Sequence, residues 1–443
     1  MSEFPPHFVF GVATSAYQIE GAVEEDGRGP SIWDVFSHTP GKTARAQTGD
    51  VACDHYHRYV GDVQLMKDLG VQSYRFSISW PRVRPEGVGR VNEAGLDFYD
   101  RLIEALLEAG IEPMATLYHW DLPQALQNRG GWTNRDTAKA FAEYADVVFA
   151  RFGGRVSRYI TVNEPWCSAV LGHAFGIHAP GLQDFGATVA AAHHLLLGHG
   201  MAVEAFRGRN MTAEIGITNI LTDVLPASAR AEDTEAAARM DVFLNRWFLD
   251  PVFQASYPEE IGALGVDSVV QPGDLERIST PLDFVGVNYY QRQYVAANQE
   301  DPLLRAALLP PSGERTASGW GVEPDGLVRV LQRVTSGYTK LPIYVTESGA
   351  AFADVLEGGA IYDDKRTAYL ERHLQAVLAA SVAGVDVRGY YVWSLLDNFE
   401  WAEGYDKRFG LVYVDYETQA RTLKESALWY QRVIGTRTLH REG

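Results

Sequence analysis

The sequence predicts an α/β protein folded as a single (β/α)8 barrel, also called a TIM barrel. Short runs rich in β-branched and aromatic residues alternate with longer stretches whose apolar residues recur every three to four positions. Eight strand–helix units can be recognised, which is the number that closes a parallel barrel. No linker, like-charge block or internal repeat divides the 443 residues, so we expect residues 1–443 to form one domain.

The expected elements follow one another at the spacing of successive strand–helix units. Strands are predicted at residues 8–13, 72–78, 112–117, 159–162, 215–219, 284–288, 343–346 and 389–393. Amphipathic helices are predicted at residues 99–109, 137–152, 187–206 and 365–380. A doubly wound open sheet is the alternative architecture. It is disfavoured because Gly87 and Gly89 form only a fragment of the glycine-rich phosphate-binding turn of that fold.

The composition argues against several classes of protein. The 57 Asp and Glu outnumber the 39 Lys and Arg, and the net charge of −18 disfavours nucleic acids and anionic membrane surfaces as partners. No apolar run reaches the ~18 residues of a membrane-spanning helix, and the first residues do not resemble a signal peptide. The two cysteines, Cys53 and Cys167, cannot form a disulfide framework. We therefore expect a soluble cytoplasmic protein with reduced thiols.

Two carboxylates are predicted at the ends of barrel strands. The fourth strand leads into Asn163 and Glu164, and the seventh into Thr346 and Glu347. Barrel enzymes build their active sites at the C-terminal ends of the strands. Two carboxylates among aromatic residues can cleave a glycosidic bond there, because one acid protonates the leaving oxygen while the other meets the positively charged sugar carbon. The alternative is that either glutamate merely ends a strand and faces water.

Longer segments surround these carboxylates in a defined order. They are residues 10–21, 74–82, 117–123, 161–167, 178–181, 287–290 and 393–401. Together they resemble the glycoside hydrolase family 1 β-glucosidases, over residues 8 to about 434. The resemblance implies that the barrel is catalytic, with Glu164 as general acid/base and Glu347 as nucleophile. It also implies retention of anomeric configuration, hence carboxyl groups ~5 to 5.5 Å apart, and no metal or organic cofactor.

The same resemblance gives the two carboxylates different surroundings. Arg75 and Tyr290 would contact the nucleophile Glu347, and a nearby guanidinium favours the ionised form of a carboxylate. Glu164 would instead keep its proton, because burial beside Trp120 and Trp166 disfavours its charged form. Once Glu347 bonds to sugar and loses its charge, Glu164 should release its proton more easily and act as a base.

The glucosyl unit is expected to meet a set of polar and aromatic side chains. By resemblance, the set is Gln18, His119, Trp120, Asn163, Asn288, Trp393, Glu400 and Trp401. Within it, Asn163 would contact the 2-hydroxyl, and Trp393 would stack on the sugar ring. One departure from the family's pattern follows the nucleophile, where Ser348 replaces the usual Asn. The alternative role is core packing for Trp393 and Trp401, and that of a buried polar residue with satisfied hydrogen bonds for Gln18 and His119.

The leaving-group side is expected around a rim loop at residues 291–320, which is rich in Gly, Pro and charge. Its candidate lining residues are Trp166, Leu171, Asn219 and Trp320. The 12 histidines show no metal-ligand spacing. We therefore interpret the stretch with His193, His194 and His199 as a solvated helix.

The predicted function is hydrolysis of terminal β-glucosyl residues from cellobiose, short cello-oligosaccharides and aryl β-glucosides. These small molecules would be its partners, and the sequence does not indicate an oligomeric state. The alternatives are a 6-phospho-β-glucosidase, a transglycosylating β-glycosidase, and a non-catalytic sugar-binding protein on the same fold. The presence of both Glu164 and Glu347 favours an enzyme, and Glu400 would repel a phosphate. The sequence does not rank glucosides, fucosides and galactosides.

Overall fold

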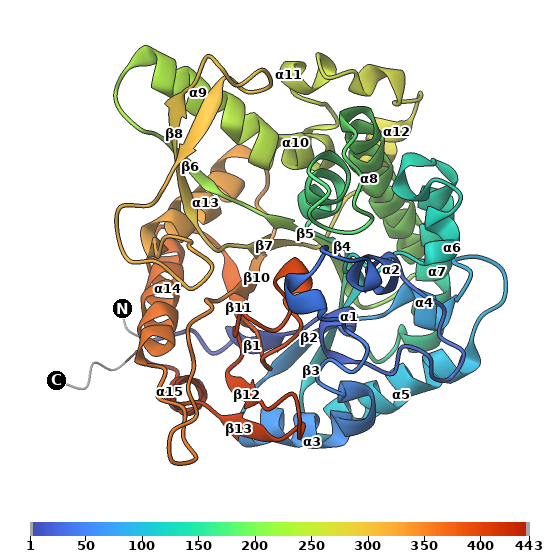
Figure 1. Cartoon of the computed structure of the whole chain (residues 1–443), viewed down its shortest axis with the longest axis vertical. Coiled ribbons are helices and arrows are strands. Elements are labelled where there is room, and N and C mark those ends of the chain that lie inside the picture. Colours follow the sequence, from blue (N-terminus) through green and yellow to red (C-terminus); the bar gives the residue numbers. More distant parts are fainter. Residues whose placement is uncertain (1–2, 440–443) are drawn as a thin grey trace.

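The computed structural model describes residues 3–439. Its centre is a closed barrel of eight parallel strands, each paired with the next (Figure 1). The strands are β1 (Val9–Ala13), β2 (Ser73–Ser77), β3 (Glu112–Tyr118), β4 (Arg158–Asn163), β5 (Glu214–Ile220), β7 (Phe284–Asn288), β10 (Ile343–Ser348) and β11 (Val387–Trp393). The predicted fold class and all eight predicted strands are confirmed.

Side chains fill the interior of the barrel. Those that pack together there include Met114, Ile160, Phe284, Tyr344 and Tyr391. Gly11 makes room for one of them, since a Cβ at this position would lie 2.3 Å from the Tyr391 ring. Because the barrel is a packed core and not a pore, a substrate site can open only at one of its ends.

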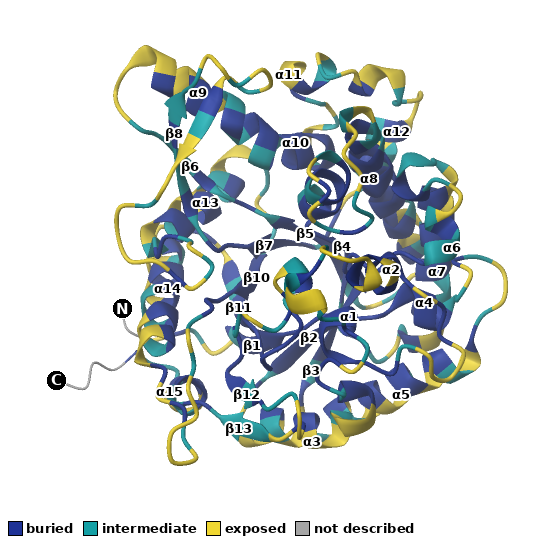
Figure 2. Ribbon diagram, in the orientation of Figure 1, coloured by how far each residue is buried: buried dark blue, intermediate teal, exposed yellow. Residues whose placement is uncertain are grey.

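Helices surround the barrel, with their buried sides toward it and their exposed sides outward (Figure 2). The longer ones are α3 (His55–Asp68), α5 (Glu93–Glu108), α7 (Asp136–Phe152), α8 (Phe185–Gly208), α13 (Pro324–Gly337), α14 (Asp364–Val382) and α15 (Glu425–Thr436). The shorter ones are α1 (Ala16–Ile19), α2 (Ile32–His38), α4 (Trp80–Val83), α6 (Gln124–Gln127), α9 (Ala231–Asp241), α10 (Trp247–Gln254), α11 (Glu259–Gly262) and α12 (Asp274–Ile278). The four predicted helices correspond to α5, α7, α8 and α14. Within residues 3–439, no helix is long and apolar enough to cross a membrane.

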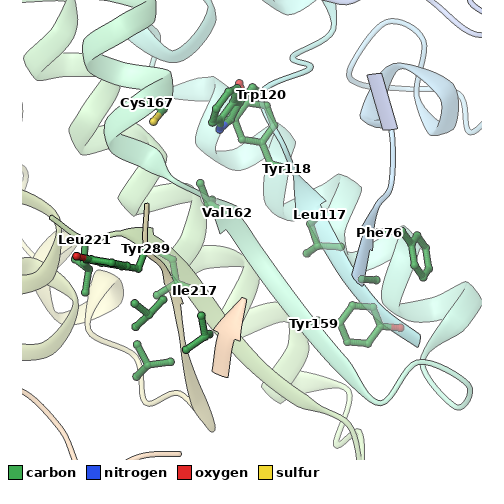
Figure 3. Close-up of a cluster of buried hydrophobic side chains, with 14 of the residues drawn as sticks. Phe76, Leu117, Tyr118, Trp120, Tyr159, Val162, Cys167, Ile217, Leu221 and Tyr289 are labelled. Carbon is green, nitrogen blue, oxygen red and sulfur yellow. The ribbon is translucent and has the colours of Figure 1, made fainter. Parts of the chain in front are cut away.

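The main hydrophobic core lies between the strands and these helices. Figure 3 shows part of it, including Phe76, Leu117 and Tyr159 from three neighbouring strands. The ring of Tyr159 lies 5.0 Å from Phe149 of α7 and 6.0 Å from Phe206 of α8, measured between ring centroids. Aromatic contacts of this kind fix each helix against its strand.

The interpretation of α8 as a solvated helix is wrong. His193, His194 and His199 are all buried, because α8 packs against α7, α12 and the barrel strands β4 and β5. His193 Nε2 lies 2.9 Å from Asp274, and His194 Nδ1 lies 2.9 Å from the carbonyl oxygen of Trp132. Burial lowers the pKa of His199 to about 3. These side chains are hydrogen-bonded core histidines.

The expected rim loop at residues 291–320 contains regular structure. β8 (Arg292–Ala297) and β9 (Ala306–Leu309) form a three-stranded sheet with β6 (Asp223–Pro226), outside the barrel. Arg292 Nε donates to Asp223 Oδ2 across this sheet at 2.7 Å. The pairing of β8 with β6, some seventy residues earlier, cannot be predicted from a local sequence pattern. A second small sheet pairs β12 (Val412–Val414) with β13 (Arg421–Leu423).

Candidate active site

A cavity of about 810 Å³ opens at the C-terminal ends of the barrel strands. Predicted site residues that line it are His119, Trp120, Glu164, Trp166, Leu171, Tyr290, Trp320, Glu347, Trp393, Glu400 and Trp401. Four more predicted residues, Gln18, Arg75, Asn163 and Asn288, are completely buried and contact this lining through hydrogen bonds. Fifteen of the sixteen predicted residues therefore gather at one place.

Glu347, near the end of β10, has a hydrogen-bond donor for each carboxylate oxygen. Arg75 Nη1 donates to Oε1 at 2.5 Å, and the Tyr290 hydroxyl donates to Oε2 at 2.6 Å. Arg75 also donates to the carbonyl oxygen of Thr346, which ties the guanidinium to the same strand. A buried carboxylate held in this way stays in one orientation, as a nucleophile requires.

Glu164, just after β4, lies in a different environment. Its Oε1 accepts a hydrogen bond from Asn288 Nδ2 at 2.6 Å, and its Oε2 accepts one from the Cys167 thiol at 3.2 Å. Both donors are neutral. Burial, and then the negative charge of Glu347, raise the pKa of Glu164 to about 8. A carboxyl group with this pKa carries a proton at neutral pH, as a general acid requires.

Two asparagines connect the carboxylates. Asn163 Oδ1 accepts from Arg75 Nη2 at 2.5 Å and from Asn288 Nδ2 at 3.1 Å. Asn163 Nδ2 lies 3.1 Å from His119 Nε2. Because Arg75 also contacts Glu347 and Asn288 also contacts Glu164, one continuous network fixes both carboxyl groups relative to each other.

Three non-glycine residues of the site have left-handed backbone conformations. Their φ angles are 79° at Trp120, 47° at Glu164 and 54° at Trp401. Such conformations cost on the order of 1 to 3 kcal/mol and persist only where surrounding contacts impose them. The backbone N–H of Glu164 donates to the carbonyl oxygen of Thr218 at 2.9 Å, and Trp120 Nε1 donates to the carbonyl oxygen of Asn163 at 2.9 Å. These two bonds hold Glu164 and Trp120 in place.

The deep end of the cavity combines polar groups with stacked rings. Gln18 and Asn398 donate to Glu400 Oε2 at 3.3 and 3.1 Å. Burial raises the pKa of Glu400 to about 8. The His119 ring is nearly parallel to Trp393, with centroids 5.7 Å apart, and burial lowers its pKa well below the usual value. A neutral imidazole, a carboxyl group and an indole face suit a sugar, which presents hydroxyls around an apolar ring face.

Comparisons with known proteins identify the family to which this chain belongs. The sequence profile of Glycosyl hydrolase family 1 matches residues 1–439. The chain belongs to glycosyl hydrolase family 1. Beta-glucosidase A of Acetivibrio thermocellus is 49% identical over 97% of this chain and 98% of its own. A bifunctional beta-D-glucosidase/beta-D-fucosidase of Bifidobacterium breve is 46% identical over 97% of this chain and 98% of its own. The family 1 β-glucosidase structure from Thermotoga maritima superposes with a TM-score of 0.97 at 46% identity, covering both chains completely.

The outer end of this family 1 cavity corrects one sequence prediction. Asn219 is buried in β5 and does not line the cavity, whereas its neighbour Ile220 does. Consecutive side chains of a strand point to opposite faces, so only one of two adjacent residues can reach the cavity. Trp166, Leu171 and Trp320 line the outer part as predicted, and sequence reasoning missed Phe36, Lys42, Cys167, Phe175, Ile177, His178 and Lys407. For Cys167 a signal was available, because it lies three residues after Glu164 in a helical turn.

The departure at Ser348 leaves the nucleophile's contacts intact. The Ser348 hydroxyl lies 3.3 Å from the Tyr369 hydroxyl of α14. Glu347 keeps its two donors, Arg75 and Tyr290. The substitution therefore changes a contact between β10 and α14. In the part of the chain that the structure describes, no group of three or more His, Cys, Asp or Glu is arranged to hold a metal ion.

Proposed function

We propose that this chain is a retaining β-glucosidase that releases terminal β-D-glucosyl residues by double displacement. One observation carries the proposal, namely the unequal surroundings of two carboxyl groups in one cavity. Glu347 accepts hydrogen bonds from a guanidinium and a phenol, and Glu164 accepts only from neutral donors and has a raised pKa. Two such groups can serve as nucleophile and acid. Residues 1–443 would act as one catalytic domain.

In the first step, Glu347 forms a bond to the anomeric carbon while the bond to the leaving oxygen breaks. Glu164 gives its proton to that oxygen, so the aglycone leaves as a neutral alcohol. The ester on Glu347 carries no charge, so one cause of the raised pKa of Glu164 is removed. Glu164 can then take a proton from water, which attacks the anomeric carbon while the ester bond to Glu347 breaks, and glucose leaves with retained configuration as the Glu347 carboxylate is restored.

A neutral glucosyl unit fits the deep end better than a phosphorylated one. Glu400, Glu347 and Glu164 share this space. Among the described residues, the hydrogen-bond donors to Glu400 are amides and not Lys or Arg side chains. A 6-phosphate beside Glu400 would meet a carboxyl group to which neither lysine of the cavity lining, Lys42 or Lys407, is hydrogen-bonded in the described residues. Cellobiose, short cello-oligosaccharides and aryl β-glucosides are therefore the proposed substrates, with transglycosylation as a second outcome when a sugar replaces water as acceptor.

Azide rescue tests the two assigned roles through stereochemistry. In Glu164→Ala, a dinitrophenyl β-glucoside needs little protonation and should still form the glycosyl-enzyme, which azide then converts to a β-glucosyl azide. In Glu347→Gly, azide in the vacated space should attack from the opposite face and give an α-glucosyl azide. Proton NMR distinguishes the anomers. The same anomer from both variants, or wild-type turnover by Glu347→Gly, would contradict the assignment.

A further inference from the structure

Cys167 lies directly against Glu164. Its Sγ is 3.2 Å from Oε2 of Glu164, and the residue is 5% exposed. Cys167 begins a π-helix (Cys167–Ala174), and its backbone N–H donates to the carbonyl oxygen of Glu164 at 2.9 Å, in the turn that leads into this helix. In Figure 3, Cys167 lies on the helix that follows Val162 of β4. The contact therefore arises from one local turn and does not depend on a flexible loop.

The thiol acts as a hydrogen-bond donor in this contact. Burial, and then the charges of Glu164 and Glu347, raise the pKa of Cys167 well above its usual value. Cys167 also lies in one group with His173 and His178, whose pKa values burial lowers to about 4 and 3. Both imidazoles are therefore neutral and do not favour the thiolate. A protonated thiol can donate to the Glu164 carboxylate.

Other titratable and charged groups also surround Glu164. Glu347 of β10 raises the pKa of Glu164, and Arg75 of β2 lowers it. Glu400, on the loop after β11, and Tyr290, after β7, respond to the charge on Glu164. His119, after β3, is neutral because burial lowers its pKa. Glu347 and Arg75 act on Glu164 through charge, whereas Cys167 and Asn288 donate hydrogen bonds to its carboxyl oxygens.

The two oxygens of Glu164 are held by donors of different strength. The amide of Asn288, which is completely buried, holds Oε1. The thiol of Cys167, which lines the cavity, holds Oε2. A thiol is a weak donor. When Oε2 carries the proton in the first step, Glu164 therefore loses only the weak hydrogen bond from the Cys167 thiol. The thiol donates to Oε2 again once the proton has left.

We propose that Cys167 is a positioning residue for Glu164, whose thiol orients Oε2 and stabilises the carboxylate form required in the second step. The proposal rests on the acid/base role proposed for Glu164. Its alternative is that Cys167 only fills space, as small buried cysteines do. The two cases differ in what happens when the donor is removed at constant volume, or is replaced by a stronger one.

The pH dependence of kcat/KM on a nitrophenyl β-glucoside separates them. Wild-type kcat/KM should fall as pH rises through about 8, because Glu164 must be protonated. Cys167→Val and Cys167→Ala remove a donor to the carboxylate and should move this alkaline limb up by ~0.5 to 1 pH unit. Cys167→Ser, with a stronger donor, should move it down. Ser168→Ala is the matched control, since the Ser168 hydroxyl makes no hydrogen bond to Glu164 and the substitution leaves the backbone contact between the two residues in place, so its limb should not move.

A second measurement does not require turnover. The infrared S–H stretching band of Cys167, identified by its loss in Cys167→Ser, should move to higher frequency in Glu164→Ala, where the acceptor is gone. The Cys53 band is an internal control, because its Sγ contacts the carbonyl oxygen of Asp397. An unmoved Cys167 band, or alkaline limbs of Cys167→Val and Cys167→Ala that superpose on wild type, would overturn the proposal. Absence of β-glucosidase activity in the wild type would overturn the proposed function and leave the infrared result as a separate outcome.

Discussion

The deep and outer ends of the cavity are constructed differently. At the deep end, Gln18 and Arg75 are completely buried and their side chains donate hydrogen bonds to carboxyl groups. At the outer end, Phe175 and Ile177 are 45% and 53% exposed and contribute apolar surface. Hydrogen bonds in a buried setting fix positions, whereas partly exposed apolar contacts tolerate different shapes. The deep end should therefore determine the sugar and the chemistry, and the outer end should adjust the aglycone.

The largest effect is expected when Arg75 is replaced. Arg75→Met removes the donors to Glu347 and Asn163, and leaves a buried carboxylate without its charged partner. We expect kcat/KM on a nitrophenyl β-glucoside to fall by ~10³-fold or more, the scale of a lost electrostatic contact in a water-excluded site. Arg75→Lys keeps the positive charge but loses the planar guanidinium with its paired donors. Its kcat/KM should lie between those of the wild type and Arg75→Met.

Arg151→Met is the matched control for Arg75. Arg151 pairs with Asp97 on the protein surface, and its side chain is 36% exposed. This substitution should leave kcat/KM unchanged within about twofold, because exposed ion pairs contribute little. Near wild-type kcat/KM in Arg75→Met would show that the buried hydrogen-bond network does not determine the reaction rate. The proposed difference between the deep and outer ends of the cavity would then be wrong.

A smaller effect is expected at Glu400. If Glu400 binds sugar hydroxyls, Glu400→Ser should lower kcat/KM on plain β-glucosides by ~10²-fold, the scale of two buried hydrogen bonds lost in the transition state. The same variant should gain relative activity on a 6-phosphorylated nitrophenyl β-glucoside. Glu403→Ser is the comparison variant, since Glu403 lies at the cavity with a side chain that is 61% exposed, and we expect a change below about threefold. Equal losses in both variants would contradict the role of Glu400.

The smallest effect is expected at the outer end. Ile177→Ser removes exposed apolar surface from the cavity. We expect KM for an aryl β-glucoside to rise by ~2- to 5-fold, which corresponds to the free energy of partly burying one apolar side chain. The kcat for a dinitrophenyl β-glucoside should be unchanged. Parallel assays with aryl glucoside and cellobiose measure the preference. A fall in kcat comparable to that of Glu400→Ser would remove the distinction between the two ends.

The periodicity of the sequence determined the barrel and the position of its chemistry. Alternation of β-branched runs with amphipathic stretches located all eight strands, because both patterns are local. Barrel topology then placed Glu164 and Glu347 at one face without knowledge of their contacts. The resemblance to a family supplied the residues around them, which no local pattern could assign.

Only the tertiary structure decided the environment of each side chain. The burial of His193 and His199 in α8 depends on packing against α7, α12 and the barrel, which the pattern of the helix itself does not show. Whether Asn219 or Ile220 faces the cavity depends on the orientation of β5. The sequence pattern of a strand does not determine which of two adjacent side chains points to which face. The pKa of Glu164 depends on burial and on Glu347, 183 positions further along the chain. Solvation, charge and hydrogen bonding are sums over spatial neighbours, and a sequence shows only the neighbours along the chain.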